Sequence, residues 1–327
     1  MAGQRNILFT ATFHSSFIDQ DLHTLQKLFH VSPVVSSGLP AFLQYVRRIA
    51  SHDITYSWFA SVYSSFLVYL AAARGKKSIL VLGGVDVASE KELRYGIWNS
   101  WWKAKIVRYG MTHASAVLAV DDFLRREAIR LARYDGANIA VVPTGYDPEF
   151  WVASGTKENV VLTVSACPDM TRAKVKGVDV FFSVARKAPD IRFQIIGIDP
   201  RIAAALAAPP NVTCLPFSDR STVLSAYQRA KVYCQLSLRE GLPNALCEAM
   251  LCECVPVGTN VGGIPTAIGE SGYLVEYRDE EQTEIAIRAA LTAAGERGKL
   301  ARRRIATRFT IAQRETALKD IIEKLLQ

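Results

Sequence analysis

Short apolar segments that favour β-strands alternate with helical patterns along almost the whole chain, and this alternation restricts the possible folds most strongly. In the first half, the strand-like segments lie at residues 6–10, 31–35, 53–59, 78–82, 115–120 and 138–142. Between the first two, residues 17–29 place Ile18, Leu25 and Phe29 on one helical face. Strands separated by helices are typical of a parallel, doubly wound sheet. We therefore predict an α/β fold.

The same alternation begins again after a segment rich in turn residues, 141–150. The later strand-like segments lie at residues 160–165, 191–196, 211–215, 232–236 and 255–258. Helical patterns from residue 279 onward close the chain, whose 327 residues suit two domains of ordinary size. We predict two Rossmann-like domains, residues 1–150 and 151–327.

Composition excludes several classes of protein. Hydrophobic residues make up 50% and charged residues 21%, which is typical of a globular chain and not of a disordered one. The net charge of +8 suits anionic ligands or an anionic membrane surface, and it equally suits plain solubility. Residues 54–73 carry no charge for nearly the length of a membrane span, but they begin as a β-like run. We predict a strand and a buried helix there.

The six cysteines form no Cys-x-x-Cys pair, and no histidine lies beyond His113 to complete a zinc site. Most of them lie in apolar runs, where a free thiol behaves as a small core side chain. The N-terminus has no long apolar stretch of the kind that marks a signal peptide. We expect a reducing, cytoplasmic compartment, no metal site and no nucleic-acid partner.

Two carboxylates, Glu240 and Glu248, border the segment in which we expect the chemistry. An apolar run, 232–236, leads into a short loop, and a helix-compatible stretch from Asn244 to Met250 follows Pro243. In an open α/β sheet, such a strand–loop–helix turn lies at the carboxyl ends of the strands, where ligands bind. Glu240 is then expected to project from the loop, and Glu248 to lie one turn inside the helix.

This pattern, Glu240-x7-Glu248 followed by Ala-Met, resembles the signature of the retaining GT-B glycosyltransferases of glycosyltransferase family four. The residues between the two carboxylates that match it are Gly241, Leu242, Pro243 and Asn244. The resemblance implies two Rossmann-like domains facing across a cleft, with the nucleotide sugar mainly on the second and the acceptor mainly on the first. It also implies that a hexose-type sugar moves from a nucleoside diphosphate to a hydroxyl with retention of anomeric configuration. By the family's roles, Glu240 contacts the donor sugar and Glu248 the ribose hydroxyls.

Lys176-Gly177 is similar to the family's Lys-Gly element, whose lysine neutralises the departing diphosphate. The chain departs from the family at Ser165 and Ala166, where relatives commonly have Gly-Arg, so Arg172 or Lys174 is expected to supply a second positive charge. No Asp-x-Asp motif lies at a suitable strand end, which favours a metal-independent transfer without a cofactor.

The first domain offers two weaker candidates for contact with the substrate. His14 follows the first strand, where it is either a surface residue or a group facing the cleft. Asp86 follows Gly83-Gly84 near the place where many relatives have a histidine that contacts the sugar. Both are retained as substrate-binding candidates.

Large aromatics occur beside cations in a helical run from Tyr95 to Tyr109. The aromatics are Trp98, Trp101 and Trp102, and the cations are Lys103, Lys105 and Arg108. The composition fits a helix at a membrane interface, and it equally fits a core helix with a basic outer face. The acceptor class therefore stays open between a glycan, a lipid-linked molecule and a small molecule, with peripheral membrane contact as one alternative.

Two rival functions remain open at this point. One is an inverting transferase or a sugar-nucleotide epimerase on the same fold, with His14 as the base. The other is a sugar-nucleotide-binding protein without turnover.

Overall fold

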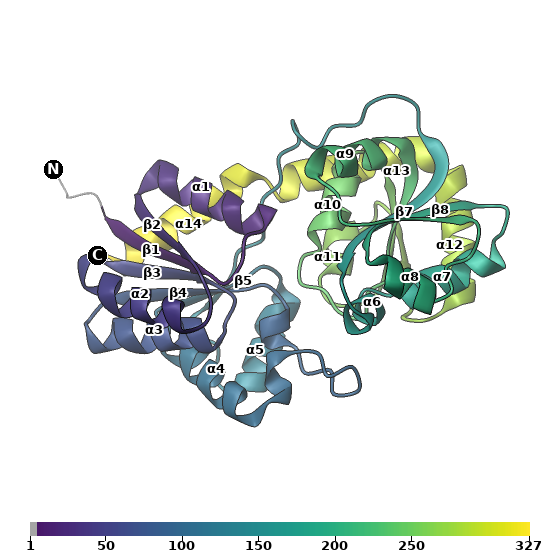
Figure 1. Cartoon of the computed structure of the whole chain (residues 1–327). Coiled ribbons are helices and arrows are strands. Elements are labelled where there is room, and N and C mark those ends of the chain that lie inside the picture. The colour runs from purple at the N-terminus through teal and green to yellow at the C-terminus, as the bar shows by residue number, and fades with distance from the viewer. Residues whose placement is uncertain (1–4) are drawn as a thin grey trace. The chain divides into compact units, whose positions relative to one another are not determined.

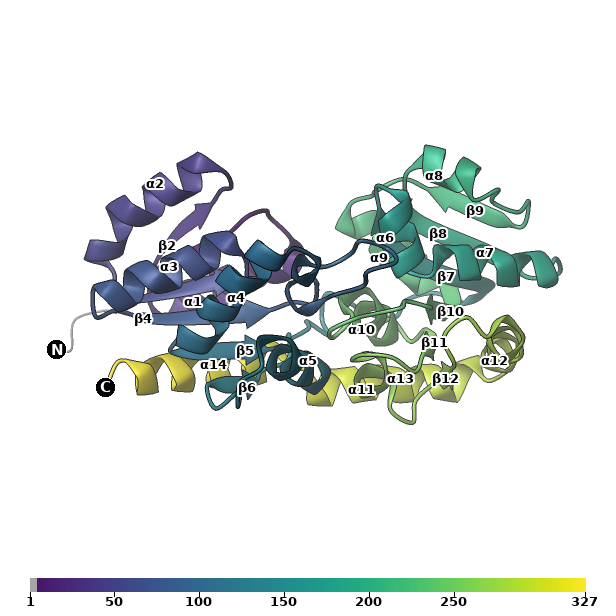
Figure 2. The same ribbon diagram turned by 90° about the horizontal axis from the view of Figure 1, so that it is seen from below.

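The computed structural model describes residues 5–327, which form two compact units (Figures 1 and 2). The first unit runs up to Thr144 and also contains Ala312–Gln327, and the second is Gly145–Ile311. Each unit contains one six-stranded sheet whose neighbouring strands pair in parallel. Helices connect the strands, so the predicted α/β fold class is confirmed for both halves.

The sheet of the first unit has the strand order β2-β1-β3-β4-β5-β6. Its strands are β1 (Asn6–Ala11), β2 (His30–Val35), β3 (Ile54–Trp58), β4 (Lys77–Leu82), β5 (Ala116–Ala119) and β6 (Ile139–Val141). Each overlaps a strand predicted from the sequence. β3, β5 and most of β4 are buried, because helices cover both faces of a parallel sheet.

The connecting helices of this unit begin at the carboxyl ends of its strands. They are α1 (Ser16–Leu28), α2 (Leu39–Arg48), α3 (Val62–Ala73), α4 (Trp101–His113) and α5 (Asp122–Ala132), with short 3₁₀ turns η1 (Ile49–Ser51), η2 (Val85–Val87) and η3 (Ile97–Asn99). A capping box between Ser61 and Ser64 starts α3, so the uncharged segment 54–73 is a strand and a helix, as predicted. Among residues 5–327, no helix is both long and apolar enough to cross a membrane.

The last helix, α14 (Ile311–Leu325), differs from the sequence prediction, which placed it in the second domain. Residues 312–327 belong to the first unit, where the Arg314 guanidinium contacts the Asp21 carboxylate at 2.5 Å and 2.6 Å. Arg314 also donates to the carbonyls of Val142 and Pro143. Both charges of this ion pair are buried, and the Asp21 carboxylate additionally accepts from Tyr56. An amphipathic helix at a chain end gives no sequence signal for the sheet on which it packs.

The sheet of the second unit has the order β12-β11-β10-β7-β8-β9. Its strands are β7 (Glu158–Cys167), β8 (Arg192–Ile198), β9 (Val212–Leu215), β10 (Ala230–Gln235), β11 (Val255–Thr259) and β12 (Tyr273–Val275). The first five overlap predicted strands, whereas β12 was not predicted. The six cysteines are free, and all except Cys214 are buried.

Aspartates start four helices of the second unit, since each N-cap carboxylate accepts a backbone N–H of the first turn. These caps are Asp169, Asp199, Asp219 and Asp279. The helices of the unit are α6 (Met170–Val175), α7 (Val178–Lys187), α8 (Pro200–Ala205), α9 (Arg220–Arg229), α10 (Asn244–Leu251), α11 (Ile264–Ile268), α12 (Glu280–Thr292) and α13 (Ala294–Arg308). Of these, α6 carries Arg172 and Lys174.

Candidate active site

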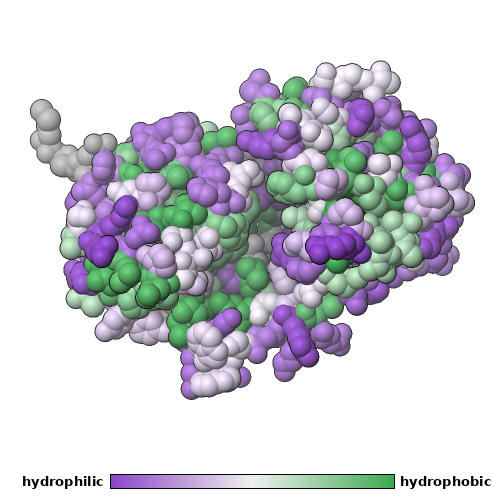
Figure 3. Space-filling view, viewed as in Figure 1, coloured by the Kyte–Doolittle hydropathy of each residue, from purple (hydrophilic) through white to green (hydrophobic). Residues whose placement is uncertain are grey.

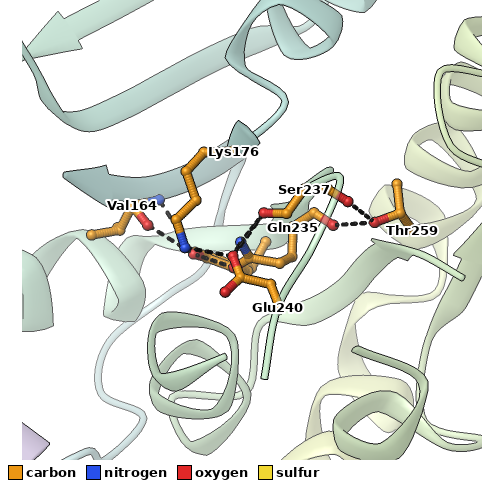
Figure 4. Close-up of polar contacts among 7 residues, drawn as sticks. Val164, Lys176, Gln235, Ser237, Glu240 and Thr259 are labelled. Atoms are coloured by element: carbon orange, nitrogen blue, oxygen red, sulfur yellow. Dashed lines mark hydrogen bonds and ion pairs between the residues drawn. The ribbon is translucent and has the colours of Figure 1, made fainter. Parts of the chain in front are cut away.

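Glu240 and Lys176 lie at the carboxyl ends of two neighbouring strands of the second sheet. Glu240 is in the loop between β10 and α10, and Lys176 lies between α6 and α7, after β7. The Lys176 ammonium nitrogen is 2.5 Å from Oε1 of Glu240, although 64 residues separate them in the sequence (Figure 4). Only 19% of the lysine side chain and 11% of the glutamate side chain are exposed. A charge pair so little hydrated interacts strongly, because little water screens it.

The same carboxylate oxygen accepts two further hydrogen bonds. Gln235 donates from Nε2 at 3.0 Å and Ser237 from Oγ at 2.8 Å (Figure 4). Three donors therefore fix the orientation of Glu240 through Oε1. Our sequence analysis missed Gln235 and Ser237. The sequence feature that could have identified them is a pair of polar residues, two positions apart, at the end of an apolar strand. Side chains two positions apart lie on the same face of a strand.

A buried network of hydrogen bonds holds the Gln235 side chain in place. The hydroxyl oxygen of Tyr233 lies 3.2 Å from Oε1 of Gln235 and 3.2 Å from the carbonyl oxygen of Val164 on the neighbouring strand. Burial raises the pKa of Tyr233 well above its usual value, which keeps the hydroxyl a neutral donor. On the other side, Thr259 donates to the Ser237 carbonyl at 2.7 Å. Side chains from β10 and the end of β11 thus position Gln235 and Ser237, and these two residues in turn position Glu240.

Two glycines allow the Glu240 loop to approach its neighbours closely. Gly177 has φ +70°, and a Cβ there would lie 1.9 Å from the carbonyl oxygen of Leu236. Gly262 has φ +58°, and a Cβ there would lie 2.2 Å from the carbonyl oxygen of Glu240. Both positions demand glycine on conformational and steric grounds. The Gly262-Gly263 turn therefore packs directly against the Glu240 loop.

Positive charge accumulates near the end of β7. Burial raises the pKa of the Cys167 thiol, and the charges of Lys176 and Arg172 oppose that shift. Arg172 is half-buried on α6, and Lys174, two residues later, is exposed. Arg172 therefore lies, like Lys176, close enough to Cys167 for its charge to act there, and the choice between Arg172 and Lys174 as the second cation stays a prediction.

Glu248 lies inside α10, in surroundings that differ from those of Glu240. Burial raises the pKa of its carboxyl group to about 8, and the charge of Arg220 opposes the shift. The Tyr227 hydroxyl donates a long hydrogen bond of 3.5 Å to Oε2 of Glu248. Arg220 packs over the ring of Phe150, 4.2 Å from the ring centre. Tyr227 and Arg220 carry no sequence signal that links them to Glu248, since both precede the motif, on α9.

The residues between the two carboxylates shape the turn. Gly241, Leu242 and Pro243 are buried, and Pro243 directly precedes α10. Asn244, the first residue of the helix, accepts a hydrogen bond of 2.8 Å from Tyr146 at its side-chain oxygen. The predicted strand–loop–helix turn is thus present around Glu240.

The two candidates from the first unit lie at the carboxyl edge of its own sheet. His14 is in the loop after β1 with its side chain 69% exposed, and its Nδ1 lies 2.9 Å from Oδ1 of Asp19. The expected contact of Asp86 with substrate stays a prediction, and the structure gives this residue a role within its own loop. Its side chain is buried, and its carboxylate accepts from the backbone N–H groups of Ala60, Gly83 and Gly84. Those bonds fold the β4–η2 loop and occupy both oxygens.

Models of two glycosyltransferase families match consecutive parts of the chain. Residues 2–150 match Glycosyltransferase Family 4, and residues 158–293 match Glycosyl transferases group 1. The chain belongs to the GT-B glycosyltransferases. The predicted glycosyltransferase family is thereby confirmed, while retention of anomeric configuration stays a prediction.

Solved structures of other members share the fold of this glycosyltransferase. Sucrose-phosphate synthase from Thermosynechococcus elongatus superposes with a TM-score of 0.81 and 13% identity, over 98% of this chain and 99% of that one. HepE of Anabaena superposes with a TM-score of 0.76 and 12% identity, over 98% of this chain and 100% of that one. These similarities confirm the predicted GT-B architecture.

Among curated proteins, the chain resembles the trehalose synthases of Thermococcus litoralis and Pyrococcus furiosus. Each is 27% identical over 182 residues, a match that includes 50% of this chain. The chain spans 44% of the length of these relatives.

Proposed function

We propose that this protein transfers a hexose-type sugar from a nucleoside diphosphate sugar to an acceptor hydroxyl, with retention of anomeric configuration. The observation that carries the proposal is the ion pair between Lys176 and Glu240, the first carboxylate of the Glu240-x7-Glu248 segment. A parallel α/β sheet binds ligands at the carboxyl ends of its strands, which is where both residues lie.

Lys176 is the group that we assign to the leaving diphosphate. When the bond between the anomeric carbon and the phosphate oxygen breaks, negative charge grows on that oxygen while the sugar becomes oxocarbenium-like. The Lys176 ammonium is held by Glu240 before the donor arrives, so it is oriented without cost at the moment of reaction. Arg172 and the N-terminus of α7 add positive potential at the same edge. The proposed transfer therefore uses cationic side chains and helix dipoles, with no cofactor.

Glu240 is the group that we assign to the donor sugar. Its Oε1 accepts from Lys176, Gln235 and Ser237, so we assign its Oε2 to a sugar hydroxyl. Because three hydrogen bonds fix Oε1, the Glu240 carboxylate keeps its position while the sugar ring changes shape. That preorganisation favours the transition state.

Glu248 is the group that we assign to the two ribose hydroxyls. Two hydroxyls donate best to an ionised carboxylate, whereas burial favours the neutral form of this one in the free protein. Nucleotide binding should therefore shift Glu248 toward ionisation.

The relatives support a nucleoside diphosphate as the shared part of the ligand. Structures of HepE of Anabaena contain UDP or UDP-glucose, and starch synthase IV of Arabidopsis thaliana is bound to ADP and acarbose. We propose a glycan, a lipid-linked molecule or a small molecule as the acceptor. The six free cysteines favour a reducing, cytoplasmic place of action.

Thermal unfolding against a panel of sugar nucleotides tests the proposal first, because a ligand that binds only the native state raises the melting temperature. Proton couplings of the product at its anomeric carbon then distinguish retention from inversion. An epimerised donor recovered without acceptor would show the rival epimerase. Donor binding without transfer or hydrolysis would show a binding protein, and either outcome would overturn the proposed reaction.

A further inference from the structure

Three helices of the first unit, α2, α3 and α4, lie side by side on one face of its sheet. The chain passes from β2 to β3, then to β4 and β5, always in the same direction across the sheet. Right-handed crossovers in one direction place their helices on the same face. α3 packs between α2 and α4, and Figure 2 shows the three in this order. Their outer sides together form one surface of the unit.

The outer side of α2 is apolar, contrary to the usual pattern of a surface helix. Leu39 is 70% exposed, Leu43 48% and Val46 45%. Their spacing of four and three residues puts them on one stripe of the helix. The buried Ala41 and Tyr45 face the sheet instead. Figure 3 shows hydrophobic atoms gathered over the region of α2 and α3. The stripe is exposed on this unit, so its apolar side chains do not stabilise α2 by burial there.

The first turn of α4 presents two tryptophans to solvent. Trp101 is 73% exposed and Trp102 is 45% exposed, so neither is the core residue that one of our sequence interpretations allowed. The Lys105 ammonium lies 5.2 Å from the ring centre of Trp101, and the Lys103 ammonium lies 5.5 Å from that of Trp102. Tryptophan with a flanking cation is typical of a lipid–water interface, where the ring enters the headgroup layer and the ammonium stays hydrated.

The charges of the three helices have one sign. α2, α3 and α4, all described in the structure, contain no Asp or Glu. Their Lys and Arg residues are Arg47, Arg48, Lys103, Lys105 and Arg108. In contrast, α1 and α14 carry charges of both signs. The next helix along the chain, α5, does carry the acidic residues Asp122 and Glu127, and each forms an ion pair with an arginine of the same helix.

We propose that the outer side of α2, α3 and α4, here called the basic apolar face, docks on the surface of an anionic lipid bilayer. A bilayer offers both complements of this face, since phosphate headgroups attract its cations and the acyl boundary takes up Leu39, Leu43 and the tryptophans. A second copy of the chain is a poor occupant, because two such faces would bring like charges together. The proposal concerns binding alone and does not depend on the transfer reaction.

Sedimentation of the full-length protein with lipid vesicles tests the proposal. Vesicles of phosphatidylcholine with about a third phosphatidylglycerol should bind the protein, and vesicles of phosphatidylcholine alone should bind it at least about 10-fold more weakly, since each surface cation contributes. Added salt should weaken the binding to anionic vesicles, because it screens the charges. Equal binding to both vesicle types, or to neither, would overturn the proposal.

Variants locate the contact. Reversing two charges, Lys103→Glu with Lys105→Glu, should lower the partition coefficient at least about 10-fold. Removing the apolar stripe, Leu39→Ser with Leu43→Ser, should lower it similarly, because the lost side chains would have been buried in lipid. Matched controls are Lys319→Glu with Lys324→Glu on α14, and Ile285→Ser, whose side chain is 63% exposed on α12. Circular dichroism confirms that each variant is folded.

Two further measurements distinguish docking on a membrane from self-association. Trp fluorescence should shift to shorter wavelength on adding anionic vesicles, and Trp101→Phe with Trp102→Phe should abolish the shift. Analytical ultracentrifugation without lipid should show no self-association through this face. Dimers that disappear in the Leu39→Ser, Leu43→Ser variant would assign the face to a second copy and refute the membrane assignment. Controls that lose vesicle binding as strongly as the face variants would refute it too.

Discussion

At the scale of single residues, the role that we assign to Glu240 requires both of its carboxylate oxygens to accept hydrogen bonds. Oε1 accepts from three donors, so a glutamine at this position must place its carbonyl oxygen there and turn its NH₂ group toward the sugar. Glu240→Gln should therefore lower kcat about 10- to 100-fold, since a hydrogen bond to a charged group is worth about 1.5–3 kcal/mol. Glu149→Gln, at an exposed position of the same unit, is the matched control. Near-normal turnover in Glu240→Gln would remove Glu240 from the site.

Lys176 and Lys174 form a natural pair for comparison, because the two lie two residues apart and only Lys176 contacts Glu240 among the bonds described. Lys176→Ala should reduce kcat by an amount equivalent to about 2.7–4 kcal/mol, because the charge on the leaving oxygen is largest in the transition state. Donor affinity should fall less. Lys174→Ala should change neither. If Lys176→Ala raised KM and left kcat intact, the lysine would bind substrate and transition state equally.

Glu248 predicts how nucleoside affinity depends on pH. Its pKa is about 8 in the free protein, and ribose hydroxyls that donate to the carboxylate would lower that pKa on binding. Binding then releases a proton below this pH, so affinity should increase as the pH rises toward about 8 and level off above it. Titrating an uncharged nucleoside by calorimetry avoids the ionisation of the diphosphate. The same slope in Glu248→Gln would show that another group titrates.

At the scale of elements, the loop between β10 and α10 needs a neighbour without a side chain at Gly177. Gly177→Ala would meet the Leu236 carbonyl at 1.9 Å and must also adopt φ +70°. Gly155 has φ +69° with nothing within 4 Å, so Gly155→Ala isolates the conformational cost, about 1–2 kcal/mol. Gly177→Ala should be less stable than Gly155→Ala in urea unfolding and should also lose kcat, because Leu236 leads into the Glu240 loop. Equal losses of stability would mean that the close approach is unimportant.

At the scale of the whole molecule, the chain returns to the first unit at its end, and Arg314 joins α14 to α1. Arg314→Ala leaves the Asp21 carboxylate buried without its cation, which typically costs about 3–5 kcal/mol. The melting temperature should fall accordingly, while Lys319→Ala, on the exposed side of the same helix, should change it little.

A second variant guards this test against a general loss of packing. Replacing both partners, Arg314→Met with Asp21→Asn, should recover part of the stability, because no buried charge then remains unpaired. A double variant as unstable as Arg314→Ala would assign the effect to lost packing of α14.

The sequence by itself determined the two α/β halves, eleven of the strands now seen and the turn that carries Glu240, because these follow from local periodicity and from residues close together in the chain. It also identified Lys176 through a local Lys-Gly element, although nothing local showed that its ammonium reaches Glu240.

Only the tertiary structure decided what depends on contacts between distant segments. Tyr233, Val164 and Thr259 support the residues around Glu240 from three different strands. That Asp86 holds its own loop, by accepting from the backbone N–H groups of Ala60 and Gly84, was also not readable from the sequence. Likewise, α14 packs with the first unit, where Arg314 and Asp21 form a buried ion pair across 293 residues. Burial and the pairing of polar side chains between distant segments are properties of the folded chain. Hydrophobic periodicity does not predict which partner each charged side chain will contact.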